Sequence, residues 1–306
     1  MKKEVKQTPA IFNSISELHR AMGLPKPFHP LVSLVNNSVI NRNPDEMITS
    51  LILNFYKISY KPNLRGKLKY GQGYYDFDEG GLLFVSPNQL LATANDNGDY
   101  EGYSLFIHPD FIRNHPLGKA IKNFGFFSYS ANEALHLSDK EKQKIISVID
   151  SIEQELTSSI DDISQDLIIS YIEVLLNYSN RFYTRQFITR KAVSNDLLVK
   201  LEELLSDYFN NEITLMKGLP TVQYLSEQLN VSPSYLSDML RSLTGQNAQQ
   251  HIHNKLIEKA KEILTATNLS VSEIAYRLGF EHPQSFSKLF KSKTNLSPLE
   301  FRHSFN

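Results

Sequence analysis

The sequence contains no cysteine among its 306 residues. Disulfides, thiolate metal sites such as zinc fingers, and cysteine nucleophiles are therefore excluded. This composition fits a reducing compartment, and we expect a cytoplasmic protein that needs no cofactor.

Long apolar runs are also missing. The most apolar segment, Leu167 to Leu176, is interrupted by Glu173 and is shorter than the ~20 residues needed to span a bilayer. The N-terminus is basic but lacks the apolar stretch of a signal peptide. We therefore expect a soluble intracellular protein without a membrane partner.

The sequence shows none of the short motifs that mark common enzymes: a glycine-rich phosphate loop, a nucleophile elbow or a His–Glu metal motif. Its one His-x-His pair, His251 and His253, lies in the C-terminal half. The N-terminal histidines are scattered, and we expect them to be structural: His19, His29, His108, His115 and His136. We predict neither catalysis nor a metal site.

A marked excess of positive charge is absent, because the formal net charge is only −1. What steers a protein to nucleic acid is the distribution of charge over one surface, so this value does not exclude DNA binding.

The length and the hydrophobic content of 41% allow two domains with packed cores.

From about Leu31 to His108, short apolar runs alternate with turn residues. This pattern is typical of a small antiparallel β-structure, either a sandwich or an open barrel. Within it, residues 70–81 (YGQGYYDFDEGG) combine aromatic side chains with Asp76, Asp78 and Glu79. They could line a pocket, but an aromatic β-core is the favoured interpretation.

The pattern becomes helical at Ser138, which forms a predicted capping box with Glu141. Apolar residues then recur at helical spacing, and a second amphipathic helix is expected from near Ser164. These helices, predicted over 138–182, either cover the β-structure or pair with their copies in a homodimer. The first helix presents Ile145, Ile149, Ile152 and Leu156, and the second Leu167, Ile168, Tyr171, Leu175 and Tyr178.

Residues 180–194 are basic, with Arg181, Arg185, Arg190 and Lys191 and no acid. They are interpreted either as a solvated face or as a linker that lies near phosphate. We place the domain boundary here, which gives an N-terminal domain of residues 1–190 and a C-terminal domain of residues 191–306.

The C-terminal domain contains an internal repeat. Residues 221–230 (TVQYLSEQLN) align with 270–279 (SVSEIAYRLG), and after one inserted residue Pro233 aligns with Pro283. Each copy predicts a helix, a tight turn and a second helix, over about 221–245 and 270–295. Ser270 and Glu273 form a capping box, and Gly279 supplies the positive φ that ends the first helix of the second copy.

The second helix of each copy has an apolar stripe and an opposite polar face. The stripes consist of Leu236, Met239, Leu240 and Leu243, and of Phe286, Leu289 and Phe290. We predict that the polar faces, with His282 beside the second, contact DNA through Ser234, Ser237, Asp238, Arg241, Gln284, Ser287, Lys288 and Lys291. From Lys217 onward ten lysines and arginines face seven acids, an excess of three.

The segment from Val222 to Arg302 resembles the AraC/XylS regulators. The motif IAYRLGFEHPQSFSKLFKSKTNLSPLEFR carries this resemblance through Ile274, Ala275, Gly279, Phe280, Ser285, Phe286, Phe290, Lys291, Pro298 and Arg302. Ser232, Tyr235, Leu236, Thr244, Gly245, Leu256, Ala260 and Leu264 extend it upstream. The resemblance implies a sequence-specific regulator of transcription, with RNA polymerase as an expected partner, in which a helix at about 251–264 joins two units that read successive major grooves. Activator is the expected class, and the sequence leaves repression open.

By the same resemblance, the N-terminal domain would be a cupin-like β-barrel that binds a small effector, dimerises, or both. The expected fold is therefore α+β, with an all-helical C-terminal domain. Two positions depart from the family pattern. Lys255 occupies a position where the family usually has arginine, and Asp238 occupies one where a basic residue is common. Asp238 keeps open a rival interpretation, a protein-interaction module that does not bind DNA. DNA-repair methyltransferases with a similar module need a cysteine acceptor, which is absent.

Overall fold

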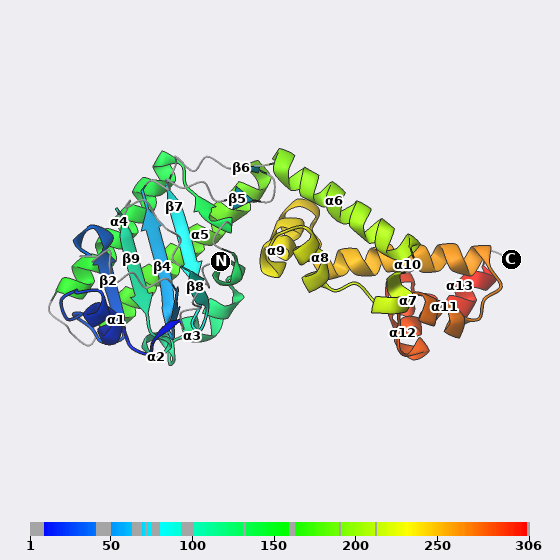
Figure 1. Cartoon of the computed structure of the whole chain (residues 1–306), viewed down its shortest axis with the longest axis horizontal. Helices are drawn as coiled ribbons and strands as arrows, with labels where there is room; N and C mark the ends of the chain where they lie inside the picture. Colours follow the sequence, from blue (N-terminus) through cyan, green and yellow to red (C-terminus); the bar gives the residue numbers. More distant parts are fainter. Residues whose placement is uncertain are drawn as a thin grey trace, which may run out of the picture. The chain divides into compact units, whose positions relative to one another are not determined.

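The computed structural model describes residues 9–40, 50–62, 69–70, 73–74, 80–92, 101–130, 133–158, 163–189, 191–211 and 213–304. Contacts within the chain divide it into two compact units, Met1–Gln186 and Phe187–Asn306 (Figure 1). None of the helices in the described ranges is long and apolar enough to cross a bilayer.

The first unit is built on a five-stranded antiparallel sheet in the order β10-β7-β4-β9-β2. Its strands are β2 (Val32–Asn36), β4 (Tyr56–Lys61), β7 (Gly81–Val85), β9 (Tyr103–Ile107) and β10 (Leu135–His136). The expectation of a barrel is corrected, because β10 and β2 form the edges of this sheet and do not pair with each other.

A second sheet has the order β1-β3-β8, and β5 and β6 form the expected hairpin. β1, which precedes the region expected to form antiparallel β-structure, runs parallel to β3. Phe12 of β1, Leu53 of β3 and Phe106 of β9 share one apolar core, so the two sheets pack against each other. The bounds are β1 (Ala10–Phe12), β3 (Ser50–Leu53), β5 (Lys69–Tyr70), β6 (Gly73–Tyr74) and β8 (Leu90–Ala92). Asp76, Asp78 and Glu79 lie outside the described residues.

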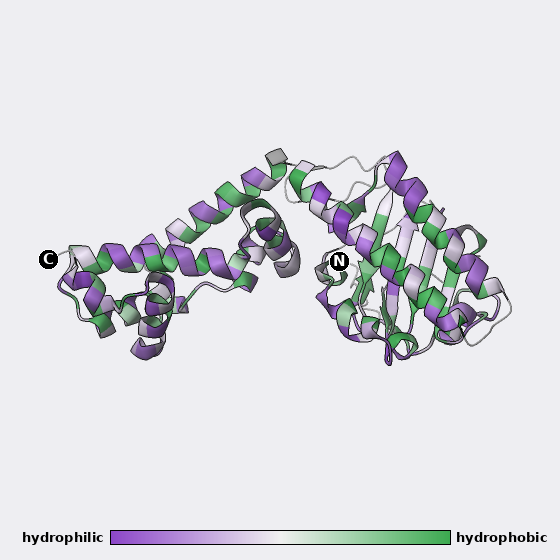
Figure 2. Cartoon of the chain, turned by 180° about the vertical axis from the view of Figure 1, so that it is seen from behind, coloured by the Kyte–Doolittle hydropathy of each residue, from purple (hydrophilic) through white to green (hydrophobic). Residues whose placement is uncertain are grey.

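Helices α4 (Asp139–Thr157) and α5 (Ser164–Thr189) lie across one face of the five-stranded sheet (Figures 1 and 2). The Ser138 backbone N–H donates to the Glu141 carboxylate at 2.8 Å, which confirms the predicted capping box. The apolar stripe predicted for α4 is buried, whereas Leu167 of α5 is 40% exposed. Shorter helices are α1 (Ile15–Ala21), α2 (Pro109–Ile112) and α3 (Pro116–Ala120), with 3₁₀ turns at Asn37–Val39, Ile121–Asn123 and Gly125–Ser128.

Of the two interpretations of residues 180–194, the linker does not fit the structure, because α5 continues to Thr189 and α6 begins at Lys191. The segment contains no proline or glycine, and its buried Phe182 and Tyr183 continue the apolar face of α5. Arg185 is an internal ion-pair partner rather than a phosphate ligand, since its guanidinium lies 2.7 Å from the Glu141 carboxylate.

The last turn of α5 also covers the outer edge of β10. The Gln186 side chain accepts from the His136 N–H at 2.8 Å and donates to the Ala134 carbonyl at 3.3 Å. Because a primary amide presents the same donor and acceptor as a peptide group, Gln186 replaces a neighbouring strand and satisfies backbone groups that would otherwise need another partner.

The second unit is all-helical in its described residues, and two helix-turn-helix units flank the long helix α10, as predicted. Its helices are α6 (Lys191–Asn210), α7 (Ile213–Lys217), α8 (Val222–Gln228), α9 (Pro233–Thr244), α10 (Ala248–Ala266), α11 (Val271–Arg277), α12 (Pro283–Thr294) and α13 (Pro298–His303). Leu256, Ala260 and Leu264 of α10 are buried. Arg302 of α13 closes the unit by donating to the carbonyls of Leu264 at 3.1 Å and Leu269 at 2.6 Å.

Candidate nucleic-acid interface

The first helix-turn-helix unit consists of α8 and α9. The buried Ser226 provides a small side chain in α8. Asn230 turns the chain with a φ of 55°, a left-handed conformation that asparagine tolerates better than most residues. The Ser232 hydroxyl then accepts from the Tyr235 N–H at 3.2 Å and caps α9, with Pro233 at its first turn.

The second unit repeats this arrangement in α11 and α12. The Ser270 N–H donates to Glu273 at 2.7 Å, and hydrogen bonds from Ser270 lower the pKa of the Glu273 carboxyl below its usual value. Gly279 has a φ of 91°, as predicted, and a Cβ there would lie 2.8 Å from the carbonyl carbon of Gly218. The turn therefore needs glycine for two reasons, its conformation and the close approach of the loop before α8.

On α9, the side chains predicted to contact DNA are less accessible than expected. Leu236, Met239 and Leu240 are buried as predicted, while Leu243 is only half-buried. The polar residues Ser234, Ser237 and Asp238 are half-buried, and Arg241 is exposed. The Arg241 guanidinium lies 2.7 Å from the Asp238 carboxylate, so the positive charge of this face is already offset.

On α12, the corresponding face is open. Phe286 and Phe290 are buried and Leu289 is half-buried, so this stripe is narrower than predicted. Of the predicted contact residues, Ser287 is half-buried and the others are exposed: His282, Gln284, Lys288 and Lys291. The structure thus brings three polar side chains and two positive charges together on one helix and immediately before it, with Lys291 in the last turn of that helix.

The predicted contact residues did not include Ser285 of α12 or the equivalent Tyr235 of α9. Ser285 is exposed in the first turn of α12, three positions before Lys288, a spacing that could have indicated it. Its counterpart in α9 is Tyr235, whose ring packs edge-on against that of Phe187 with the centroids 5.2 Å apart. Phe187 is 3% exposed, and no short-range pattern in the sequence indicates its contact with α9.

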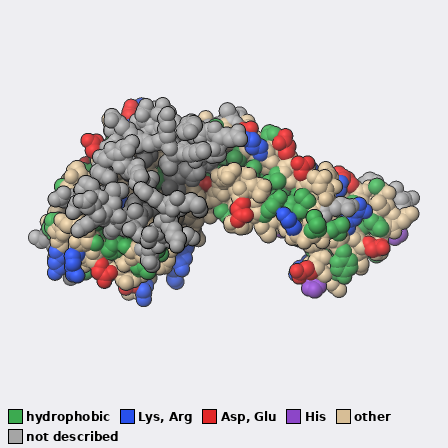
Figure 3. Space-filling view, viewed as in Figure 1, with side chains coloured by type: hydrophobic (Ala, Val, Ile, Leu, Met, Phe, Trp, Pro, Cys, Tyr) green, Lys and Arg blue, Asp and Glu red, His purple; other side chains and the backbone are tan. Residues whose placement is uncertain are grey.

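The charge around α12 also depends on side chains of the neighbouring helices α10 and α13. Hydrogen bonds from Ser297 and, more weakly, the nearby Lys291 lower the pKa of the Glu300 carboxyl. Burial and then Lys293 lower the pKa of His253 on α10. Lysine, arginine and acidic side chains are interspersed on the face of the second unit seen in Figure 3. Attraction to phosphate would therefore be local rather than the effect of one large basic patch.

The histidines of the first unit have structural partners. His19 is buried, with its ring nitrogens 2.6 Å from the Pro25 carbonyl oxygen and 3.0 Å from the Ser33 hydroxyl. His108 and His115 accept backbone N–H groups at the starts of α2 and α3. Within the part of the chain that the structure describes, no group of three or more side chains is arranged to hold a metal ion.

The C-terminal unit matches a family model described as a helix-turn-helix domain, over residues 225–304. The chain is similar to the uncharacterized HTH-type transcriptional regulator YfiF of Bacillus subtilis, with 24% identity over 81% of this chain and 76% of that protein. It is 32% identical to the HTH-type transcriptional activator RhaS of Salmonella paratyphi B over 39% of this chain. The matched part covers only 40% of RhaS, and 9% of a histidine kinase of Formosa agariphila.

Solved structures with similarity include the C-terminal domain of the response regulator AraT from Geobacillus stearothermophilus. It is 30% identical, with a TM-score of 0.32, over 35% of this chain and 84% of that one. ToxT from Vibrio cholerae is 17% identical, with a TM-score of 0.30, over 89% of this chain and 93% of that one. The family match itself lies wholly within the second unit.

Proposed function

We propose that this chain, which belongs to the AraC/XylS family of helix-turn-helix transcription regulators, reads two successive major grooves with α9 and α12. The observation that carries this proposal is the repeat of two helix-turn-helix units, each with a side-chain cap on its first helix, on the single connecting helix α10. Successive major grooves on one face of B-DNA are about 34 Å apart, so two readers on a rigid connector select both half-sites together.

Within this proposal the second reading helix provides most of the affinity. Gln284 can bond adenine bidentately, and Lys288 can reach guanine, because both are exposed at the beginning of α12. Arg241 and Asp238 of α9 contribute less, since each already neutralises the other. Ser234, Ser237 and Ser287 are suited to secondary contacts, with His282 and Lys291 at the edges.

The test is an electrophoretic shift with the full-length chain, DNA from upstream of its own gene and unrelated DNA, at two salt concentrations. We expect specific binding that weakens with salt, since each phosphate contact adds roughly 0.9 to the slope of log K against log salt. The double variant Gln284→Ala, Lys288→Ala should lose the preference for specific DNA. Lys200→Ala on α6, whose ammonium pairs with Asp196 at 2.7 Å, is the control. If the wild-type chain shows no salt-dependent shift, the protein-interaction alternative replaces this proposal.

We further propose that the first unit controls DNA binding through a small polar effector on the inner face of the five-stranded sheet. Ser59 and Ser104 are buried neighbours on β4 and β9, and the Ser104 hydroxyl donates to the Asn37 side-chain oxygen at 2.8 Å. Lys57, two positions from Ser59, lies on the same face. The buried hydroxyls, the amide of the adjoining 3₁₀ turn and the lysine on the same face are suited to orienting a polar ligand. A Ser104→Val variant should keep DNA binding and lose the response to an effector.

The dimer that we propose uses α5. Ile163, Leu167 and Val174, which are 62%, 40% and 40% exposed, follow one another along one stripe of this helix region. An antiparallel copy centred on Val174 would place Arg181 of one chain opposite Leu167 of the other, next to Asp166, which brings opposite charges close together. Sedimentation of the full-length chain should show a dimer, and Val174→Glu a monomer. A wild-type monomer at micromolar concentration that binds paired sites cooperatively would contradict this interface.

As an activator, the DNA-bound regulator would also contact RNA polymerase. We expect that contact on a surface of the second unit outside the two reading faces. In vitro transcription from the same upstream DNA distinguishes activation from repression.

A further inference from the structure

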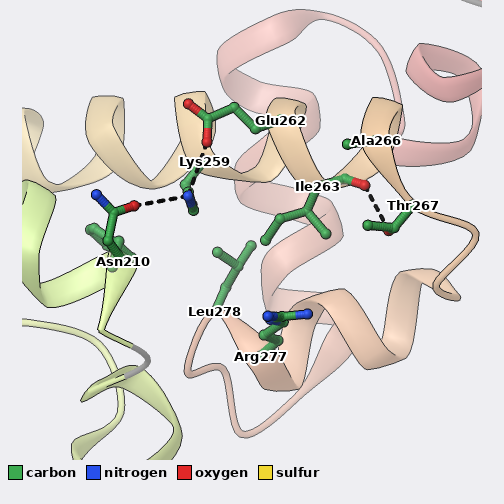
Figure 4. Close-up of a pocket in the computed structure, with 9 residues that line it drawn as sticks. Asn210, Lys259, Glu262, Ile263, Ala266, Thr267, Arg277 and Leu278 are labelled. Atoms are coloured by element: carbon green, nitrogen blue, oxygen red, sulfur yellow. Dashed lines mark hydrogen bonds and ion pairs between the residues drawn. The ribbon is translucent and has the colours of Figure 1, made fainter.

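A cleft of about 270 Å³ lies in the second unit where the end of α6, the second half of α10 and the end of α11 meet. Its floor is apolar: Phe209 and Leu278 are buried, and Ile263 of α10 faces Leu278 across the gap between the helices (Figure 4). This volume is near the lower limit of about 300 Å³ for small-molecule sites, which restricts the occupant to a small compound.

Polar side chains surround this floor. The Lys259 ammonium lies between Asn210 and Glu262, at 2.9 Å from the Asn210 side-chain oxygen and 3.0 Å from the Glu262 carboxylate (Figure 4). An ammonium carries three N–H donors, and these two acceptors engage two of them. The Glu262 side chain is 65% exposed, so it can turn toward solvent when a stronger acceptor arrives.

Arg277 adds a second positive charge on the α11 side of the cleft. Its backbone is held in place, because the Thr214 hydroxyl of α7 donates to the Arg277 carbonyl at 2.7 Å. Among the described residues that line the cleft, Lys259 and Arg277 carry positive charge and Glu262 carries negative charge, above an apolar floor. That combination is complementary to an organic anion, whose carboxylate meets the cations while its hydrocarbon part covers Ile263 and Leu278.

We propose that this cleft binds a small organic acid that bridges Lys259 of α10 and Arg277 of α11 and thereby adjusts the second helix-turn-helix unit. Arg277 lies two residues before Gly279, at the turn into the reading helix α12. A ligand held by both cations ties that turn to the connecting helix. The regulatory part of this inference rests on the proposed function, whereas binding to the cleft does not.

Binding is measured without DNA, by calorimetry on the full-length chain, with benzoate, benzamide and inorganic phosphate as probes. We expect saturable benzoate binding, and at least tenfold weaker binding of benzamide, which lacks the charge, and of phosphate, which lacks the apolar part. Arg277→Gln should weaken benzoate binding roughly tenfold, through loss of a charge-assisted hydrogen bond. Ala266→Phe, which fills the cleft from an exposed position of α10, should abolish it.

The matched control is Lys261→Gln, which removes a cation of the same helix that lies over the Phe301 ring instead of in the cleft. It should leave benzoate affinity within twofold of wild type. Benzoate binding that is absent, or equal in wild type, Arg277→Gln and Ala266→Phe, overturns the site. If the cleft binds phosphate more tightly than benzoate, the proposal that its ligand is an organic acid is wrong.

A final experiment distinguishes binding of a free ligand from binding of a DNA phosphate. Without benzoate, Arg277→Gln should leave the DNA affinity and its salt slope unchanged. Benzoate should change the DNA affinity of the wild-type chain and not that of Ala266→Phe. A salt slope lowered by about 0.9 in Arg277→Gln means that Arg277 holds a DNA phosphate, which overturns the ligand role. Benzoate binding by a chain that never shifts DNA refutes the proposed function and leaves the site intact.

Discussion

The two helix-turn-helix units share a backbone plan but exchange the residues that make its tight turns. The hydroxyls of Thr244 and Thr294 both donate to the carbonyl four residues earlier at 2.8 Å, so α9 and α12 end alike. The following left-handed residues are Gly245 and Asn295, while the turns inside the units have Asn230 and Gly279. Glycine and asparagine thus occupy opposite positions in the two units, because both tolerate a positive φ.

The outward faces of the units differ more than their turns. Tyr235 in α9 packs on Phe187, whereas its counterpart Ser285 in α12 is exposed. Asp238 pairs with Arg241 on the first face, and the second presents Lys288 without an acid in its own helix. The repeat is therefore maintained where the backbone requires it and has diverged where a partner would bind. We expect the second reader to anchor the protein on DNA and the first to discriminate poorly.

The largest expected effect tests the backbone side of this comparison. Gly279→Ala should destabilise the protein by about 3 kcal/mol, because alanine meets both a strained φ of 91° and the backbone of Gly218 and Leu219. Gly245→Ala is the matched control: its φ is 76° with nothing within 4 Å, so only strain of about 1–2 kcal/mol applies. Urea unfolding of the two variants measures the difference. Equal costs would show that the close approach at Gly279 is not limiting.

A second prediction tests the reading faces. Lys288→Ala should weaken specific DNA binding by about 1–3 kcal/mol if the ammonium contacts a base. Ser237→Ala on the half-buried face of α9 should cost much less. Competition shifts with specific and unrelated DNA, at one salt concentration, compare the two variants. A greater loss for Ser237→Ala would reverse the assignment of anchor and discriminator.

The turns, caps and buried stripes of the second unit could be predicted from the sequence because they depend on neighbouring residues. Ser270 and Glu273, or Gly279 and its positive φ, are contained within a few positions of one another. The same holds for Ser138 and Glu141 at the start of α4. The HTH arrangement followed from the alignment of two such patterns.

What could not be predicted depends on residues far apart in the chain. The parallel pairing of β1 with β3 joins Ala10 to Leu51, and the Gln186 amide binds the backbone beside His136. The local pattern of the basic run at 180–194 is compatible with a solvated face or a linker, since it does not show that Arg185 meets Glu141. For the same reason, the half-burial of Ser234 and Ser237 was not foreseen.

A smaller effect is expected at the ion pair of the first reader. Asp238→Ala should release Arg241 to contact phosphate, which raises affinity for unrelated DNA and steepens its salt slope by roughly 0.9. The gap between specific and non-specific binding should narrow. Asp196→Ala on α6, which breaks the 2.7 Å pair with Lys200 away from the reading helices, is the control. Loss of specific binding with unchanged non-specific binding would instead identify Asp238 as a base reader.

The smallest expected effect is a pH dependence confined to the second unit. Burial of His253 and, secondarily, Lys293 of α12 lower the pKa of this histidine below its ordinary value of 6.5. Between the lowered folded value and 6.5, the unfolded chain binds more protons at this position than the folded chain. The contribution of His253 to stability is therefore complete above pH 6.5 and declines as the pH falls below it. His253→Gln, which can retain the contact with Gln249, should remove the share of the stability loss between pH 7.5 and 5.5 that is due to His253, as measured by urea unfolding.

The control is His251→Gln. His251 on the same helix faces Thr244 and Glu202 instead, so this variant should keep the stability loss that is due to His253. An identical decline in wild type and His253→Gln would show that the lowered pKa of His253 does not contribute to the loss of stability at low pH.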